Sequence, residues 1–136
     1  MQKSFLIIGT ILAGLAVVLG AFGAHSLKKL VGPETVSAYQ TGVQYQMYHA
    51  LALLLLGLLY ERTQNSLLNF AGIFFMAGVL FFSGSLYLLA SLKAINKVGT
   101  TGIGILTPIG GLFFIIGWVL LLISLLKNNR FCPTKK

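Results

Sequence analysis

Four long stretches of apolar residues, separated by short polar breaks, dominate this sequence. They extend over residues 4–24, 43–60, 67–92 and 103–126, and none of them contains Asp, Glu, Lys or Arg. At a helical rise of about 1.5 Å per residue, roughly 20 residues cross the ~30 Å hydrocarbon core of a bilayer. The pattern therefore predicts an all-α integral membrane protein, a bundle of four transmembrane helices in one domain over residues 1–136.

The first stretch also admits a second interpretation. Lys3 resembles the basic start of a secretory signal peptide, and residues 21–23 resemble a cleavage site. The stretch is longer, however, than the apolar region of a signal peptide, which spans about 7–15 residues. It also carries small residues at helical spacing. We therefore expect a transmembrane helix that is retained.

A polar segment precedes the second stretch. Pro33 and Glu34 suit the first turn of a helix, since proline lacks only a donor that is unpaired there and an acid matches the positive end of the helix dipole. Residues 33–46 are rich in Gln and Tyr, which predicts a polar, amphipathic start to the helix. Two arrangements remain open: one spanning helix, or a helix in the membrane plane that bends into the bilayer.

Proline and glycine interrupt the fourth stretch, at Thr107-Pro108 and Gly110-Gly111. A proline inside a membrane helix removes a backbone donor and usually kinks the helix. The sequence therefore predicts a kink near Pro108. Residues 127–136 form a basic tail, and the one cysteine, Cys132, has no second cysteine with which to form an intrachain disulfide.

Composition and charge agree with a membrane location. Hydrophobic residues make up 57% of the chain and charged residues 9%, whereas a soluble domain carries about 25% charged residues. The formal net charge is +8. The basic residues lie in short clusters around the apolar stretches, as in the loops of membrane proteins, where anionic headgroups attract them. We therefore expect membrane lipid, and not nucleic acid, as their partner.

The distribution of basic residues favours one orientation. Four crossings place both termini on one side, which carries six basic residues, whereas the other side carries four. The positive-inside rule then predicts cytoplasmic termini in a plasma or inner membrane. The first set is Lys3, Arg62, Lys127, Arg130, Lys135 and Lys136, and the second is Lys28, Lys29, Lys93 and Lys97.

Small residues recur at helical spacing on two of the predicted helices. Ala16, Gly20 and Ala24 share a face of the first, and Gly110 and Gly117 lie seven residues apart on the fourth. Small residues let helices approach closely, and close packing drives helix association in lipid. They are predicted packing positions, against a helix of the same chain or of another copy, and we expect a homo-oligomer.

Five polar residues within or beside the apolar stretches are candidates for a polar cavity: His25, Gln46, His49, Ser83 and Thr107. Polar groups at membrane depth are costly and often functional, and His49 is the main candidate. Tyr45 lies one helical turn before it and can reach it by a hydrogen bond or by stacking. The alternative is that these groups bond to neighbouring hydroxyls or to their own backbone.

The missing acidic residues argue against catalysis. Glu34 and Glu61 both lie at loops. A carboxylate-driven pump needs an acid within the membrane, and most hydrolases need an acid–base pair. Two histidines and one cysteine, far apart, do not have the spacing of a metal site. We therefore expect no enzymatic activity, no cofactor and no metal.

Four segments carry a resemblance to a known family. They are residues 20–25 (GAFGAH), 45–50 (YQMYHA), 82–87 (FSGSLY) and 106–111 (LTPIGG), the last followed by Gly117-Trp118. In this order they resemble the bacterial family called domain of unknown function 423, which is similar to eukaryotic transmembrane protein 256. The resemblance implies a four-helix protein of the bacterial inner membrane. It brings no established activity, substrate or site residues.

Three hypotheses for the function follow. The first is a non-enzymatic membrane protein that acts through self-association or through contacts with lipid or other membrane proteins. The second is a small-solute or ion transporter or channel, with a polar cavity around His49 and Thr107. The third, a membrane enzyme that acts on lipid, is the least favoured because the apolar stretches hold no acid.

Overall fold

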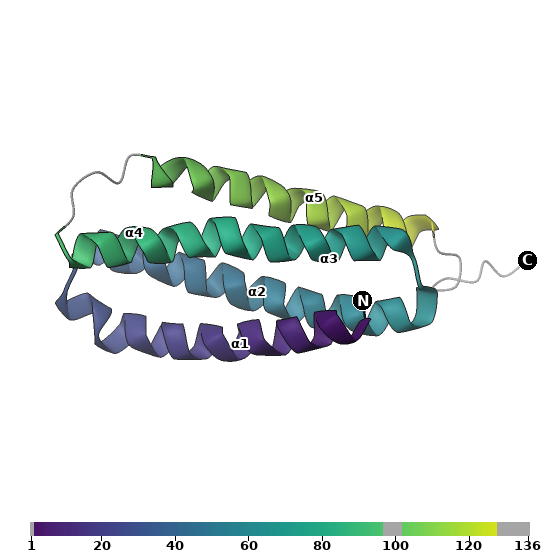
Figure 1. Cartoon of the computed structure of the whole chain (residues 1–136), viewed down its shortest axis with the longest axis horizontal. Helices are drawn as coiled ribbons and strands as arrows, with labels where there is room; N and C mark the ends of the chain where they lie inside the picture. Colours follow the sequence, from purple (N-terminus) through teal and green to yellow (C-terminus); the bar gives the residue numbers. More distant parts are fainter. Residues whose placement is uncertain (1, 97–101, 128–136) are drawn as a thin grey trace, which may run out of the picture.

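The computed structural model describes residues 2–96 and 102–127, and all of its long elements are helices (Figure 1). Helix α1 covers Gln2–His25, α2 Pro33–Thr63, α3 Ser66–Gly78, α4 Gly84–Ala94 and α5 Leu106–Lys127. Three short helical turns join or extend them: η1 at Leu27–Lys29, η2 at Val79–Ser83 and η3 at Ile103–Ile105. Cys132, Lys97, Arg130, Lys135, Lys136 and most of the basic tail lie outside the described residues.

The helices form four rods that are long and apolar enough to cross a membrane. Helices α3 and α4 are one rod, Ser66–Ala94, because η2 joins them as a turn of π-helix. The predicted all-α bundle of four transmembrane helices is confirmed. The α2–α3 turn and the last residues of α5 lie at one end of the bundle, and α1 begins toward the same end but short of it (Figure 1).

Helix α2 runs without a break from the polar segment through the leucine-rich segment. Gly32 precedes it, Pro33 is its first residue and Glu34 lies in its first turn. Its end is sharp: Gln64 adopts a left-handed conformation (φ 44°), and the Asn65 side chain accepts a hydrogen bond from the backbone N–H of Leu67 at the start of α3. The described chain therefore has one continuous α-helix here, long and apolar enough to be a single span.

Pro108 does not kink a helix, because it is the third residue of α5. Helix α5 begins directly after η3. The first backbone N–H groups of an α-helix have no partner within that helix, so a proline there removes no helical hydrogen bond. The prediction of a kink near Pro108 is therefore wrong. The irregularity inside a rod lies instead at η2, where a π-helical turn interrupts the third rod.

Small residues make close contacts between the rods. Buried Ala16 and the adjoining Gly20 face α2, where Gly20 approaches Val43, and Ala24 is partly buried. A side chain at Gly110 would overlap the backbone of Phe82, and one at Gly117 would lie 2.6 Å from the ring of Phe75. These positions therefore pack within the chain.

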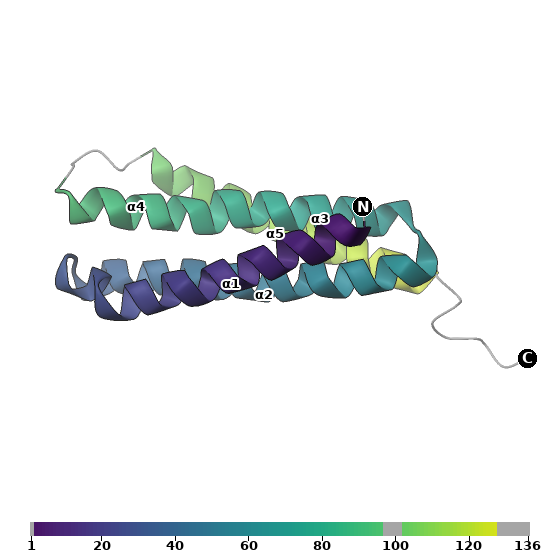
Figure 2. The same ribbon diagram turned by 60° about the horizontal axis from the view of Figure 1, so that its bottom comes forward.

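The hydrophobic core lies toward the α2–α3 end of the bundle. The ring of buried Phe5 packs against Gly72 of α3, among Leu53, Leu68 and Phe75. Figure 2 shows the first turns of α1 crossing toward α3. Toward the other end, a smaller cluster of Leu27, Tyr39 and Ala90 joins α2, α4 and the α1–α2 connection.

Candidate functional site

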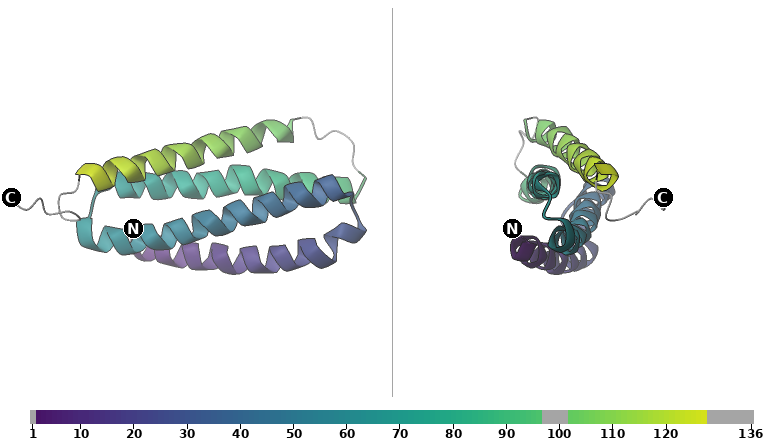
Figure 3. Two further views of the ribbon diagram at one scale, coloured as in Figure 1. Left: turned by 180° about the vertical axis from the view of Figure 1, so that it is seen from behind. Right: turned by 90° about the vertical axis from the view of Figure 1, so that its right-hand side faces the viewer.

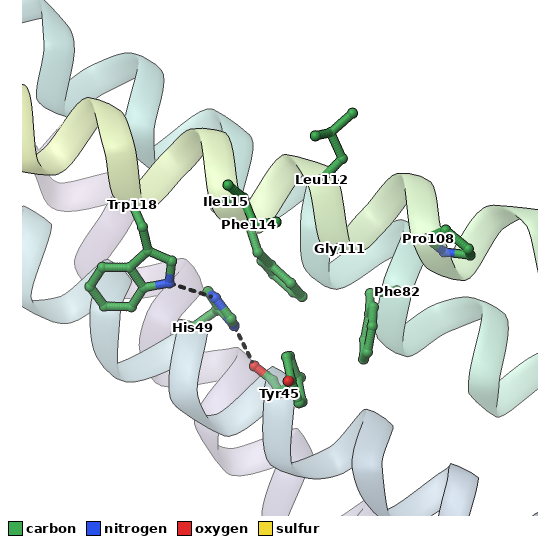
Figure 4. A pocket seen from close by; sticks show the side chains of 9 residues that line it. All are labelled: Tyr45, His49, Phe82, Pro108, Gly111, Leu112, Phe114, Ile115 and Trp118. Atoms are coloured by element: carbon green, nitrogen blue, oxygen red, sulfur yellow. Dashed lines mark hydrogen bonds between the residues drawn. The ribbon is translucent and has the colours of Figure 1, made fainter.

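A groove of about 530 Å³ lies between α2 and α5, beside the π-helical turn η2 (Figure 4). Ile115 is 61% exposed and Trp118 is 46% exposed, so the groove opens on the outer surface of the bundle. The groove is lined by Tyr45, His49, Phe82, Pro108, Gly111, Leu112, Phe114, Ile115 and Trp118.

Both ring nitrogens of His49 are hydrogen-bonded at the inner wall of this groove. Nδ1 lies 2.8 Å from the backbone oxygen of Tyr45, and the indole N–H of Trp118 donates to Nε2 at 3.1 Å (Figure 4). A carbonyl oxygen only accepts and an indole nitrogen only donates. His49 is therefore neutral in this arrangement, with its proton on Nδ1, and it has no free nitrogen to offer a substrate.

Aromatic rings pack against one another along the wall of the groove. The imidazole of His49 stacks on Phe114, with ring centroids 3.5 Å apart and planes 10° apart. The ring of Tyr45 stacks on Phe82, with centroids 4.6 Å apart. The predicted pair of Tyr45 and His49 is also stacked, at 6.1 Å. His49 and Phe114 are buried beneath the groove, and the exposed rings of Tyr45 and Trp118 offer apolar contact area with little side-chain freedom to lose on binding.

The part of the groove around His49 lies level with the middle of the apolar stretch of α1. The side chain of Gln46, in the same turn of α2 as Tyr45 and His49, donates to the backbone oxygen of Leu12 at 2.8 Å. Leu12 is near the middle of the uncharged residues 4–24 of α1. The surroundings of the groove at this depth are therefore lipid chains and not headgroups.

Gln46 itself joins three helices and does not line the groove. Besides its bond to Leu12 of α1, its side-chain oxygen accepts a hydrogen bond from the Tyr87 hydroxyl of α4 at 2.8 Å. Gln46 is 4% exposed. Its amide therefore serves to hold α1, α2 and α4 in register.

The candidate hydroxyl residues likewise bond to neighbouring helices. The Ser83 hydroxyl donates to the backbone oxygen of Gly42 at 2.7 Å, which links η2 to α2. Thr107 and Ser85 are joined by a 2.7 Å hydrogen bond between their hydroxyls, which links α5 to α4. Neither Ser83 nor Thr107 lines the groove.

His25 lies apart from the other candidates. It is the last residue of α1, its side chain is exposed, and its Nδ1 lies 3.1 Å from the backbone oxygen of Ala21 in its own helix. Of the five residues proposed for a polar cavity, His49 alone lines the groove. The other four lie at separate hydrogen-bonding positions.

Several residues of the site could not be found from sequence patterns. Trp118 is 69 positions from its partner His49, and Phe82 and Phe114 lie in stretches that contain many phenylalanines. Helical spacing predicts neighbours on one helix, such as Tyr45 and His49. It does not reveal which residue of another helix faces them. Within residues 2–96 and 102–127 there is no cluster of three or more His, Cys, Asp or Glu side chains that could hold a metal.

Comparisons with known proteins identify relatives along most of the chain. A UPF0382 membrane protein of Staphylococcus aureus strain bovine RF122 is 45% identical over 131 residues, which cover 93% of this chain and 98% of the relative. A second UPF0382 membrane protein, of strain USA300, is 44% identical over 126 residues with the same coverage. No solved structure is significantly similar to the chain. The family model described as protein of unknown function (DUF423) matches residues 19–111, and the chain therefore belongs to this family of membrane proteins.

Proposed function

We propose that this protein is a non-enzymatic membrane protein that binds the hydrocarbon chain of a membrane lipid in the groove between α2 and α5. The groove itself carries the proposal: an open cavity of about 530 Å³ with aromatic walls at the depth of lipid chains. Pockets for small molecules typically measure about 300–1,000 Å³ and are mostly apolar. Lipid chains are the molecules present at this depth.

The pairing of the polar groups favours binding over catalysis. A general base needs a nitrogen or oxygen free to take a proton from a substrate. Both nitrogens of His49 are already bonded, one to a backbone oxygen and one to Trp118. The same pairing favours binding over transport, because Gln46, Ser83 and Thr107 bond to other helices instead of lining the groove.

A substitution that places a larger side chain in the groove tests the proposal. Gly111 lines the groove, and a Cβ atom at this position would lie 3.9 Å from the Phe82 ring, an ordinary contact distance. Gly111→Leu therefore fills part of the groove with a side chain, and the distance to the Phe82 ring leaves room for its Cβ atom. The matched control is Gly14→Leu on α1, where a Cβ atom meets nothing within 4 Å and which does not line the groove between α2 and α5.

Lipid binding is measured by native mass spectrometry of the protein released from lipid nanodiscs. Crosslinking to a phospholipid with a diazirine in its acyl chain is the second readout. We expect Gly111→Leu to weaken lipid retention roughly tenfold, because the leucine displaces part of the bound chain and removes on the order of ten dispersion contacts of about 0.1–0.2 kcal/mol each. We expect crosslinks at Leu112 and Ile115 to be lost in this variant. Equal lipid retention in Gly111→Leu, Gly14→Leu and the unchanged protein would contradict the proposal.

A further inference from the structure

The outward face of α2 carries both polar and apolar exposed side chains. The α2 outer face consists of Gln44, Tyr48, Leu51, Leu55 and Leu58, at alternating spacings of four and three residues. Each of these side chains is exposed, Tyr48 at 57% and Leu51 at 54%. Seen from behind, α2 runs along the near side of the bundle between α1 and α5 (Figure 3). None of these five residues lines the groove.

Gln44 is placed within the hydrocarbon by its neighbours on α2. Val43 packs beside Gly20 of α1, and Gln46 bonds to Leu12 of α1. Both contacts fall inside the uncharged residues 4–24, so Gln44 lies between them in depth. Its side chain is exposed, and the hydrogen bonds found among residues 2–96 and 102–127 leave its amide without a side-chain partner.

An amide at this position is costly if the face meets lipid chains. Hydrocarbon offers no hydrogen bonds, and an amide carries two donors and an accepting oxygen. Gln46, two residues away, shows the usual solution, since both ends of its amide bond to other helices of the bundle. The Gln44 amide points away from those helices, so a partner for it has to come from outside the chain.

We propose that the α2 outer face binds the same face of a second copy of this chain. When two copies that insert with the same orientation pack about an axis along the membrane normal, residues of equal depth meet. Gln44 then meets Gln44 of the second copy. An amide is complementary to itself because it both donates and accepts, so the two side chains satisfy one another.

The rest of the face fits the same arrangement. Spacings of three and four residues are those of helices that cross at about 20°, the commonest packing of membrane helices. Farther along α2, toward its C-terminal end, Tyr48 meets Tyr48 of the second copy. Leu51, Leu55 and Leu58 likewise meet their counterparts in an apolar contact. The small residues on α1 and α5 are not needed for this contact, because they pack within the chain.

Cysteine crosslinking tests the pairing in membranes. In a Cys132→Ser background, which removes the single native cysteine, Gln44→Cys and Leu51→Cys are introduced separately. The purified full chain is reconstituted in phospholipid vesicles and treated with a mild oxidant. We expect disulfide-linked dimers at both positions. The matched control is Val17→Cys on α1, an exposed position (63%) at a similar depth, which is expected to stay monomeric.

A second measurement separates the role of the amide from that of the leucines. Resonance energy transfer between labelled copies is followed as the vesicles are diluted with lipid. We expect Gln44→Leu to weaken dimerisation roughly tenfold, the effect of losing an interhelical hydrogen bond of about 1.4 kcal/mol, and Gln44→Asn to retain most of it.

Three outcomes overturn the proposal. The first is equal crosslinking at Val17 and Gln44, and the second is a dimer affinity that Gln44→Leu leaves unchanged. The third is crosslinking of Gln44→Cys to a different protein in native membranes in preference to a second copy. Because the α2 outer face is separate from the groove, each of these results leaves the lipid-binding measurements at Gly111 to be judged on their own.

Discussion

At the scale of single residues, the buried polar side chains of this protein serve as connections between helices. Gln46 bonds to Leu12 of α1 and to Tyr87 of α4, Ser83 bonds to the backbone of α2, and His49 bonds to Trp118 of α5. In lipid, such bonds are among the forces that hold helices together, since the hydrophobic effect does not act between helices already in hydrocarbon. These residues therefore set how the helices are rotated and aligned.

Gln46→Leu tests whether the Gln46 amide holds the helices together, and Gln44, a glutamine two residues away, is the comparison. The substitution removes two interhelical hydrogen bonds and leaves the Tyr87 hydroxyl unpaired, so we expect a loss of about 1–3 kcal/mol in the free energy of unfolding. The measurement is reversible unfolding of the monomer in detergent micelles titrated with a denaturing detergent. Gln44→Leu, at an exposed position, is the control, with an expected change below about 0.5 kcal/mol. Similar losses in both variants would show that Gln46 has no special role.

The sequence identified which residues are polar at membrane depth but not what they bond to. Gln46 and His49 stand out because they interrupt or precede a run of leucines. Their partners Tyr87 and Trp118 lie on other helices, 41 and 69 residues away. The pairing depends on how each helix is rotated about its axis, which no local pattern specifies.

At the scale of helices, glycines allow the close contact between α5 and the third rod. Gly110 packs directly against the backbone of Phe82 in the π-helical turn, and Gly78 accommodates the ring of Phe114. A π-helical turn contains an extra residue and displaces the side chains that follow it. At η2, Phe82 lines the groove, and Ser83 beside it bonds to α2.

Two adjacent glycines of α5 give a matched prediction. Gly110→Ala would force α5 away from the backbone of Phe82, and we expect a loss of about 1–3 kcal/mol in the free energy of unfolding. Gly111→Ala meets the Phe82 ring at 3.9 Å. We expect this variant to be neutral or to gain up to about 1 kcal/mol, because alanine favours the helix. Unfolding in titrated micelles measures both, and a Gly110→Ala variant as stable as Gly111→Ala would disprove the close contact.

At the scale of the whole molecule, the four antiparallel rods place the basic residues at two ends. Lys3, Arg62 and Lys127 lie at the end with the α2–α3 turn, and Lys28, Lys29 and Lys93 lie at the other (Figure 1). The bundle therefore has a defined pair of ends, and the excess of basic residues in the sequence favours the first end as the cytoplasmic one.

Labelling of single cysteines tests the orientation. In the Cys132→Ser background, we expect Ser26→Cys to react with a membrane-impermeant maleimide in intact cells. Arg62→Cys should react only after the membrane is permeabilised, because it lies at the opposite end of the bundle. Labelling is read from the mass shift of the purified chain. The reverse pattern would place the termini outside the cytoplasm.

The apolar stretches alone establish four membrane-spanning rods of helix, and an even number of crossings brings the two ends of the chain to one side. Hydrophobicity and length are properties of each segment alone, so lipid selects the spans before any helix meets another. Other features appear only in the folded bundle: which small residues face which helix, how His49 and Gln46 are paired, where the π-helical turn lies, and the aromatic groove between α2 and α5. These features depend on rotation and register between helices distant in the chain, which are set by packing and by hydrogen bonds formed only once the helices are together.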